Sequence, residues 1–471
     1  MDRRRGRYKK ISRRRKNQEQ GIILGILILV LVAIGFGVVA YKVSKGTAEE
    51  VKENSLGSPT LTIGPTPTII LTNTPTATHI PTVTNVPTAT STPTPTIILT
   101  NTPTPILTSP ETGLLCTPTP TSKPVWNENY LVGFEDTREK LDNVIGAYVG
   151  LNLNSKDRLE KWLKLAEETE LNAVVIDVKA DTGKITYQMN CPIFEDSQVY
   201  SNDYKDMLTL VQTLKEHGIY TIARIVCFKD NYVGTIHPEY MLYNKDGSIY
   251  QDNEGNHWIN PYNQEAWAYI LEIAKQAVVD GFDEICFDYI RVATNGMNGV
   301  DFGEIAQEMT LQEAMTAFTK YVCNHLKPMG AFVSASVYGT VIRSKVDAEL
   351  IGQNYVEMAR YLDYICPMIY PSHYANSYAG ISVPDAKPYD LVFSELTASQ
   401  KQLAVLENQQ ETYAEVRPWL QAFTANWIKG HIKYTGSIIR KQVDATNDVG
   451  YSTWLLWNAN SSYPDGSFLK K

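Results

Sequence analysis

Residues 144–457 alternate between short apolar runs and longer amphipathic runs, and no other feature constrains the fold as strongly. Eight strands separated by helices favour a (β/α)8 TIM barrel with long loops, because parallel strands need helical crossovers. A doubly wound sheet is the alternative, but the sequence shows neither a GxGxxG pattern nor a P-loop pattern to support one. The strands are expected at 144–150, 172–178, 220–228, 285–288, 331–337, 365–370, 417–423 and 451–457, and the helices at 155–170, 204–217, 264–279, 311–321, 356–362, 394–406 and 434–446.

The fourth expected strand ends in charge, within the run GFDEICFDYIR at 281–291. Because side chains alternate along a strand, Glu284, Cys286 and Asp288 share one face. A carboxylate at the carboxyl end of a parallel strand lies where barrel enzymes keep their chemistry. Asp288 is therefore the first catalytic candidate. The structural alternative is that Asp288 caps the next segment or pairs with Arg291.

The second expected strand also ends in charge. Asp177, Lys179 and Asp181 follow an apolar start on one face, and charges are costly inside a core unless they are paired. This placement suits the carboxyl end of a barrel. The alternative is a structural set of ion pairs, with Lys179 bound to Asp177 and Arg224 of the third strand bound to Asp288.

Polar and aromatic residues gather at most of the other strand ends. Aromatic rings stack on the apolar faces of sugars, and sugar hydroxyls need donors and acceptors, so the pattern favours a carbohydrate site. Core packing is the alternative for the aromatic residues. The candidate sugar-binding residues are Lys179, Arg224, Asp230, Tyr338, Tyr370, His373, Gln421, Trp457 and Asn458.

The N-terminal region predicts a membrane anchor. Residues 1–20 carry ten Lys or Arg and form a basic tail, and residues 21–41 contain no charged residue. Twenty-one apolar positions are long enough to span a hydrocarbon core, and the positive-inside rule places the basic tail in the cytoplasm. We therefore expect a single-pass protein of the cell membrane with everything after residue 41 outside. A cleaved signal peptide is the alternative.

Residues 42–126 form a predicted disordered linker between the anchor and the barrel domain at 127–471. Thr and Pro dominate its greater part, and PTPTIILTNTPT occurs at 65–76 and again at 93–104. So many prolines exclude regular elements and favour an extended, semi-rigid stalk. A stalk of this kind would carry the barrel toward or through a cell wall.

Charge and cysteine usage narrow the function classes. Beyond residue 20 the chain holds 33 basic and 49 acidic residues, and an acidic body argues against nucleic-acid binding. No CxxC pattern or Cys/His cluster predicts a metal, and no organic cofactor is expected. Three of the six cysteines, Cys227, Cys286 and Cys366, fall in expected strands and are interpreted as core residues.

Five motifs in the expected barrel resemble those of a known family. They are LNAVVIDVKADTGKITY (171–187), FDEICFDYIRV (282–292), CPMIYPSHY (366–374), RPWLQAF (417–423) and GYSTWLLWNA (450–459). In this order they resemble a family of proposed glycoside hydrolases, domain-of-unknown-function family 4015, over roughly residues 140–465. The resemblance implies a (β/α)8 barrel related to glycosidases, with Asp288 where related barrels carry a catalytic Asp on strand 4.

Glycoside hydrolysis usually needs two carboxyl groups. Glu284 is a poor partner for Asp288, because it lies at the other end of the same strand. The wider group of barrels often has a Glu at the end of strand 4, 5 or 7, and this sequence has none there. We favour Asp181 or Asp177 as the acid. Other carboxylates expected at this end are Asp230, Glu239, Asp252 and Glu254.

The predicted function is therefore a membrane-anchored, extracytoplasmic glycoside hydrolase that acts on cell-wall or exported polysaccharide. A non-catalytic barrel that binds carbohydrate or cell wall, displayed on the same stalk, is the alternative from a different class.

Overall fold

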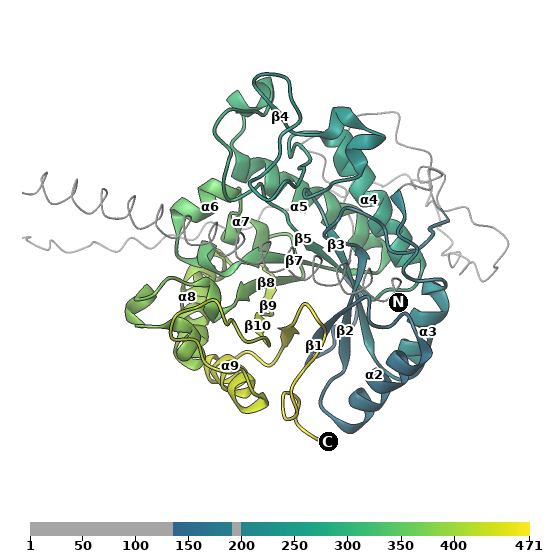
Figure 1. The fold of residues 1–471 in the computed structure, drawn as a ribbon, viewed down its shortest axis with the longest axis vertical. Helices are drawn as coiled ribbons and strands as arrows, with labels where there is room; N and C mark the ends of the chain where they lie inside the picture. The colour runs from purple at the N-terminus through teal and green to yellow at the C-terminus, as the bar shows by residue number, and fades with distance from the viewer. Residues whose placement is uncertain (1–134, 191–198) are drawn as a thin grey trace, which may run out of the picture. The chain divides into compact units, whose positions relative to one another are not determined.

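The computed structural model describes residues 135–190 and 199–471, and a closed parallel barrel of eight strands forms its centre (Figure 1). The strands pair in chain order, and the last pairs with the first to close the ring. The predicted barrel is thus confirmed. Its strands are β1 (Ile145–Gly150), β2 (Ala173–Lys179), β3 (Tyr220–Val226), β5 (Glu284–Asp288), β7 (Phe332–Tyr338), β8 (Tyr364–Ile369), β10 (Trp419–Gln421) and β11 (Trp454–Trp457).

The seventh barrel strand is split in two. A short piece, β9 (Glu415–Val416), pairs with the start of β8, and β10 pairs with the end of β8. Pro418 lies between the two pieces, and proline has no backbone N–H to donate to a ladder. The predicted strand at 417–423 is therefore shorter than expected.

Helices surround the barrel in Figure 1. The expected helix at 264–279 is found with those bounds, whereas the one expected at 394–406 begins earlier, at Pro388, because proline is well tolerated in the first turn. The helix at 345–351 was not predicted. The helices are α2 (Lys156–Glu168), α3 (Met207–Glu216), α4 (Gln264–Val279), α5 (Leu311–Leu326), α6 (Lys345–Ile351), α7 (Tyr355–Ala359), α8 (Pro388–Asn408) and α9 (Gly436–Val449).

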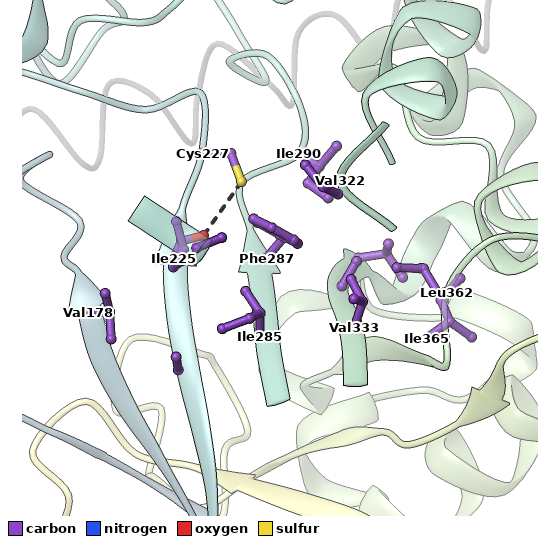
Figure 2. Packing of buried hydrophobic residues seen from close by; sticks show 14 of the residues in the cluster. Val178, Ile225, Cys227, Ile285, Phe287, Ile290, Val322, Val333, Leu362 and Ile365 are labelled. Carbon is purple, nitrogen blue, oxygen red and sulfur yellow. Dashed lines mark hydrogen bonds between the residues drawn. The ribbon is translucent and has the colours of Figure 1, made fainter. Parts of the chain in front are cut away.

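The barrel strands bury both of their faces. Ile285 and Phe287 of β5 point outward, into the layer between barrel and helices that also holds Val322 of α5 (Figure 2). Cys286 points inward, into a separate apolar cluster inside the barrel. The period-2 pattern predicted for this strand is confirmed.

The cysteines of the described residues are core residues. Cys227, Cys286, Cys323 and Cys366 are all buried and free. Cys227 packs in the outer layer, with its sulfur 3.5 Å from the carbonyl oxygen of Ile225 (Figure 2). The interpretation of the three strand cysteines as packing residues is confirmed.

The long segments that follow β3 and β5 form a small sheet of their own. Two short antiparallel strands, β4 (Tyr243–Asn244) and β6 (Val300–Asp301), join them. This sheet was not predicted, since strands of two residues leave no periodic signal in a sequence. It extends one side of the molecule beyond the barrel (Figure 1).

The predicted basic tail, transmembrane segment and linker, with the first residues of the predicted barrel domain, lie in 1–134, outside the described residues. Within 135–190 and 199–471, no helix combines the length and the apolar character that crossing a membrane would require.

Candidate active site

Arg224 of β3 lies at the centre of the candidate site and contacts three carboxylates. Its Nε and Nη2 atoms lie 2.8 and 2.7 Å from Oδ2 of Asp288, and its Nη1 donates to Oδ1 of Asp177 at 2.8 Å. The two oxygens of Asp181 lie 3.2 and 3.3 Å from Nη1 and Nη2. One guanidinium group, 1% exposed, therefore holds three carboxylates together.

Strand register explains why these residues meet. Arg224 is level with Asp177 on β2 and with Cys286 on β5, so all three side chains face the barrel interior. Asp288 comes two residues later, at the carboxyl end of β5. Asp181 belongs to the turn after β2. Strand pairing thus brings the charged side chains together at this end of the barrel, as predicted.

The three carboxylates differ in exposure. The side chains of Asp177 and Asp288 are 5% and 8% exposed, whereas that of Asp181 is 42% exposed. Asp181 is therefore the carboxylate of the three that is open to solvent.

The same surroundings move two pKa values in opposite directions. Burial raises the pKa of Asp177, and neither the Arg224 charge nor the hydrogen bond from Tyr148 fully offsets it. For Asp181 burial also raises the pKa, but the charge and hydrogen bonds of Arg224 outweigh it, and the net pKa is lowered. Environments that separate the pKa values of neighbouring carboxyl groups are typical of acid–base pairs.

Aromatic rings enclose the cluster. Tyr148 donates its hydroxyl to Oδ2 of Asp177 at 2.6 Å, and its ring packs 4.1 Å from that of Trp457. The Arg224 guanidinium lies 5.3 Å from the Trp457 ring. Tyr370 is close enough to Asp288 and Arg224 for both charges to influence its pKa, although burial is the main cause of its rise. The structure therefore brings together Trp457, Tyr370, Arg224 and the three Asp candidates.

Tyr289 also belongs to this cluster, and the sequence analysis missed it. Its side chain helps to lower the pKa of Asp181, and its backbone N–H donates to Oδ1 of Asp288 at 2.7 Å. Its φ of 55° lies in the left-handed region, which costs a non-glycine residue of order 1–3 kcal/mol and often marks functional sites. The available signal was an aromatic residue directly after the strand-end Asp288.

Tyr338 lies on the far side of Tyr289, half-buried. The guanidinium of Arg291 packs 4.7 Å from the Tyr338 ring, 4.5 Å from the Tyr289 ring and 5.1 Å from the Trp258 ring. Its Nη1 donates to the carbonyl of Val292. The alternative pairing of Asp288 with Arg291 is therefore wrong, since Asp288 is bound by Arg224.

Lys179 and Asp230 form a separate buried pair. Their charged atoms lie 2.8 Å apart, and neither side chain is exposed. Asp230 also accepts the backbone N–H groups of Tyr232 and Val233, so its role here is to hold the loop after β3. The alternative pairing of Lys179 with Asp177 is wrong, because a register irregularity in β2 directs Lys179 toward that loop.

Gln421 and Asn458 are turned toward backbone rather than toward solvent. Gln421 is fully buried, accepts from the N–H of Ser372 and donates to Asp385 and to the carbonyl of Phe423. Asn458 donates to the carbonyls of Ala422 and Ser462. Both residues brace loops at the carboxyl end of the barrel, and the structure leaves little of either side chain for a sugar.

His373 lies beside the buried Tyr370, at the surface. Its ring meets that of Tyr370 edge-on at 5.4 Å, and its Nδ1 lies 3.0 Å from the Ser372 hydroxyl. Burial against these neighbours lowers the pKa of His373, although the charge of Asp385 acts against the shift. The imidazole is therefore neutral near neutral pH.

The remaining carboxylate candidates lie away from Arg224. Glu239 pairs with His237, Asp252 accepts from Asn256 and from the Trp258 indole, and Glu254 belongs to the same turn. Across the described residues, no group of His, Cys, Asp or Glu side chains is arranged to hold a metal ion.

Asp288 shares the Arg224 guanidinium with two other carboxylates. Asp177 and Asp181 come from β2 and the turn after it, and both contact Nη1 of the arginine that binds Asp288. Glycoside hydrolysis usually uses two carboxyl groups about 5 to 9.5 Å apart. Asp177 and Asp181 are therefore the carboxyl groups to consider as partners of Asp288.

Comparison with known proteins identifies a family for the barrel domain. A family model described as a "putative glycosyl hydrolase domain" matches residues 146–463. No curated protein that we compared matches the sequence.

Solved structures add similarity of fold. The glycoside hydrolase domain of PgaB (BpsB) from Bordetella bronchiseptica aligns at a TM-score of 0.50 and 13% identity, over 69% of this chain and 97% of that one. A hypothetical protein from Ruminiclostridium thermocellum is 34% identical over 40% of this chain and 96% of its own, with a TM-score of 0.38. The spore cortex-lytic enzyme SleL from Bacillus cereus is 11% identical over 69% and 72%, with a TM-score of 0.42.

Proposed function

Since the chain belongs to the family of glycosyl hydrolase domains whose model spans residues 146–463, we propose that it cleaves O-glycosyl bonds of a polysaccharide at the Arg224 cluster. One observation carries this proposal. Three carboxylates from two strand ends share a single buried arginine at the carboxyl end of the barrel, where barrel enzymes keep their chemistry. The cluster carries more negative than positive charge, which a purely structural ion pair would not need.

Asp288 is the proposed nucleophile or base. Arg224 makes two contacts to one of its oxygens, and the Tyr289 N–H donates to the other. The Asp288 carboxylate either attacks the anomeric carbon, forming a glycosyl–enzyme bond that water later breaks, or takes a proton from the attacking water.

Asp177 is the proposed acid. A general acid must hold its proton until the glycosidic C–O bond breaks, and then give it to the leaving oxygen. Among the strand 2 carboxyl groups, burial raises the pKa of Asp177, whereas Arg224 lowers that of Asp181. Asp181, the more exposed of the two, would contact sugar hydroxyls.

The substrate class follows from the surroundings of this cluster and from the N-terminal sequence. Trp457 and Tyr338 are partly exposed rings near charged groups, a combination that suits a sugar. The basic tail, the apolar segment 21–41 and the Thr/Pro-rich stalk support a membrane-anchored protein with its barrel outside the cell. Cell-wall or exported polysaccharide is the polymer such a barrel would meet.

The test of location uses intact cells that express the full-length chain. The barrel should remain with the membrane fraction and be removed by protease added outside. A chain that stays protected in intact cells, or that is recovered free of membrane, would contradict the anchor.

The test of activity measures reducing ends released from chitosan, glycol chitin, hydroxyethylcellulose, xylan and purified peptidoglycan by the full-length chain. We expect Asp288→Asn to lower release by about 10³-fold, the range for loss of an acid–base group. Glu349→Gln is the matched control, because Glu349 is an exposed carboxylate on α6. Equal release by wild type and a folded Asp288→Asn chain would remove Asp288 from the mechanism.

A non-catalytic carbohydrate-binding barrel is the second candidate. The low exposure of Asp177 and Asp288 favours this alternative. Both carboxylates form ion pairs with Arg224, and buried ion pairs of this kind can stabilise the barrel without taking part in catalysis. Binding of a glycan by wild type and by Asp288→Asn, with no release from any of the five polymers, would favour this alternative over hydrolysis.

A further inference from the structure

We propose that Phe423 and Trp427 form an outer sugar-binding subsite, which holds a second part of the glycan chain while the Arg224 cluster holds the bond to be cleaved. This inference rests on the proposed function, because it assigns a polymer of several sugar units to the same site. Trp427 is 67% exposed, and no other aromatic side chain of the described residues is as open to solvent.

A row of rings connects this tryptophan to the catalytic cluster. Trp427 packs nearly parallel to Phe423, at 6.1 Å between centroids and an interplanar angle of 18°. Phe423 meets Tyr370 edge-on at 6.0 Å, and Tyr370 is close enough to Asp288 for the charge to influence its pKa. His373 contacts both Phe423 and Tyr370. Ring contacts therefore run from the buried Tyr370 to the exposed Trp427.

All of these rings lie at one end of the barrel. Tyr370 and His373 follow the carboxyl end of β8, and Phe423 and Trp427 follow the carboxyl end of β10. Asp288 ends β5 at the same edge, because the strands are parallel. A glycan chain that reaches Asp288 would thus have the Trp427 ring available beyond it.

The surroundings of Trp427 favour a sugar over an apolar protein surface. Its chain neighbours Asn426, Lys429 and His431 are polar and exposed, whereas Ile428 is partly buried. Protein interfaces gather several apolar residues in a contiguous core. A single ring with polar side chains around it offers a stacking face for a pyranose, and partners for its hydroxyls.

Hydrogen bonds from buried residues hold the loop that carries Trp427. Gln421 donates to the carbonyl of Phe423, and Thr424 accepts from the N–H of Tyr434. Buried Asp385 accepts from Gln421 and from the N–H of Ile432. A loop held in this way loses less conformational freedom on binding, which favours affinity. This bracing also gives Gln421 a positioning role in place of the predicted sugar contact.

The experiment measures binding in the full-length Asp288→Asn chain, so that the glycan is not consumed. Retardation in native gels that contain each of the same five polymers gives relative affinities. We expect Trp427→Ala to weaken binding by about tenfold, and Trp427→Phe to retain most of it, because a ring still stacks. Tyr413→Ala is the matched control, since Tyr413 is an exposed aromatic residue before β9, at the amino end of the strand.

Each outcome decides the inference separately from the proposed function. Loss of affinity in Trp427→Ala with full affinity in Tyr413→Ala supports the subsite, even if no polymer is hydrolysed by wild type. Equal affinity of Trp427→Ala and its parent overturns the subsite, even if wild type hydrolyses the glycan. Failure of the parent chain to bind any of the five polymers also overturns it.

Discussion

The two ends of strand β5 hold two arginine–carboxylate clusters that differ in balance and exposure. At the amino end, Glu284 pairs with Arg417 at 2.9 Å, and neither side chain is exposed. Ser334 and Tyr220 donate to the same carboxylate. At the carboxyl end, Arg224 binds three carboxylates, one of which is 42% exposed.

The amino-end cluster is balanced and closed. One cation faces one anion, and the Arg417 guanidinium also packs 3.6 Å from the Tyr364 ring. Its Nε and Nη2 have no hydrogen-bond acceptor among the described residues, so the ring face takes the place of one. With both charged side chains buried, this cluster holds strands together inside the barrel.

The carboxyl-end cluster is unbalanced and partly open. Within this cluster burial raises the pKa of Asp177, whereas Arg224 lowers the pKa of Asp181. A role in stability alone does not require the two pKa values to differ. Tyr289 adds a backbone conformation that is costly for a non-glycine residue. The comparison teaches that excess charge and strain, rather than buried charge alone, distinguish a candidate active site within one barrel.

The largest effect on stability is expected at the amino end. Glu284→Gln leaves Arg417 buried without its counter-ion, which costs about 3–5 kcal/mol of unfolding free energy. Asp288→Asn should cost less, because Arg224 keeps Asp177 and Asp181. Urea unfolding of the full-length chains at one pH measures both. A larger loss for Asp288→Asn than for Glu284→Gln would reverse the comparison and make the carboxyl-end cluster the structural one.

A smaller effect, on the rate of hydrolysis, should distinguish the roles of Asp177 and Asp181. Asp177→Asn should lower hydrolysis by about 10²-fold or more, since it removes the proposed acid. In wild type, activity should fall as the pH rises through the raised pKa of Asp177, because the acid loses its proton. This alkaline limb should persist in Asp181→Asn. Loss of the limb in Asp181→Asn instead would transfer the acid role to Asp181.

Stability provides an independent check of the same pKa. Burial raises the pKa of folded Asp177 above its unfolded value, so the native chain binds more protons than the unfolded chain between the two values. The contribution of Asp177 to stability is therefore present at pH below the unfolded pKa and is lost as the pH rises through the folded pKa. Unfolding free energies measured against pH should lose this decline in Asp177→Asn. An unchanged decline would assign it to another group.

The sequence predicted the barrel and the position of Asp288 because both follow from local periodicity. Eight apolar runs identify the strands, and alternation along β5 separates Asp288 from the outward Phe287. The Arg224–Asp288 pair, which the sequence offered as a structural alternative, is confirmed. The contacts of Arg224 with Asp177 and Asp181 could not be predicted in this way, since these partners lie 47 and 43 residues away and register decides which side chains meet.

Sequence patterns also could not separate polar side chains that face a ligand from those that brace a loop. Gln421 and Asn458 end strands as Asp288 does, yet their amides are used by nearby backbone groups. The partner of Lys179 depends on an irregular register in β2 that no residue type signals. Such contacts depend on loop geometry, which is specified by many weak interactions rather than by a period.

The smallest expected effect sharpens the comparison at a single hydroxyl. Tyr148 donates to Oδ2 of Asp177 at 2.6 Å, and this hydrogen bond lowers the pKa that burial raises. Tyr148→Phe removes the donor, so the pKa of Asp177 should rise further and the alkaline limb of the pH–activity profile should move to higher pH. The unfolding free energy should fall by about 1 kcal/mol, the usual net value of one hydrogen bond. Tyr220→Phe is the matched control, because its hydroxyl donates to Glu284 at the other end of the barrel. A limb that moves to lower pH in Tyr148→Phe, or that moves equally in both variants, would show that the Asp177 proton does not set it.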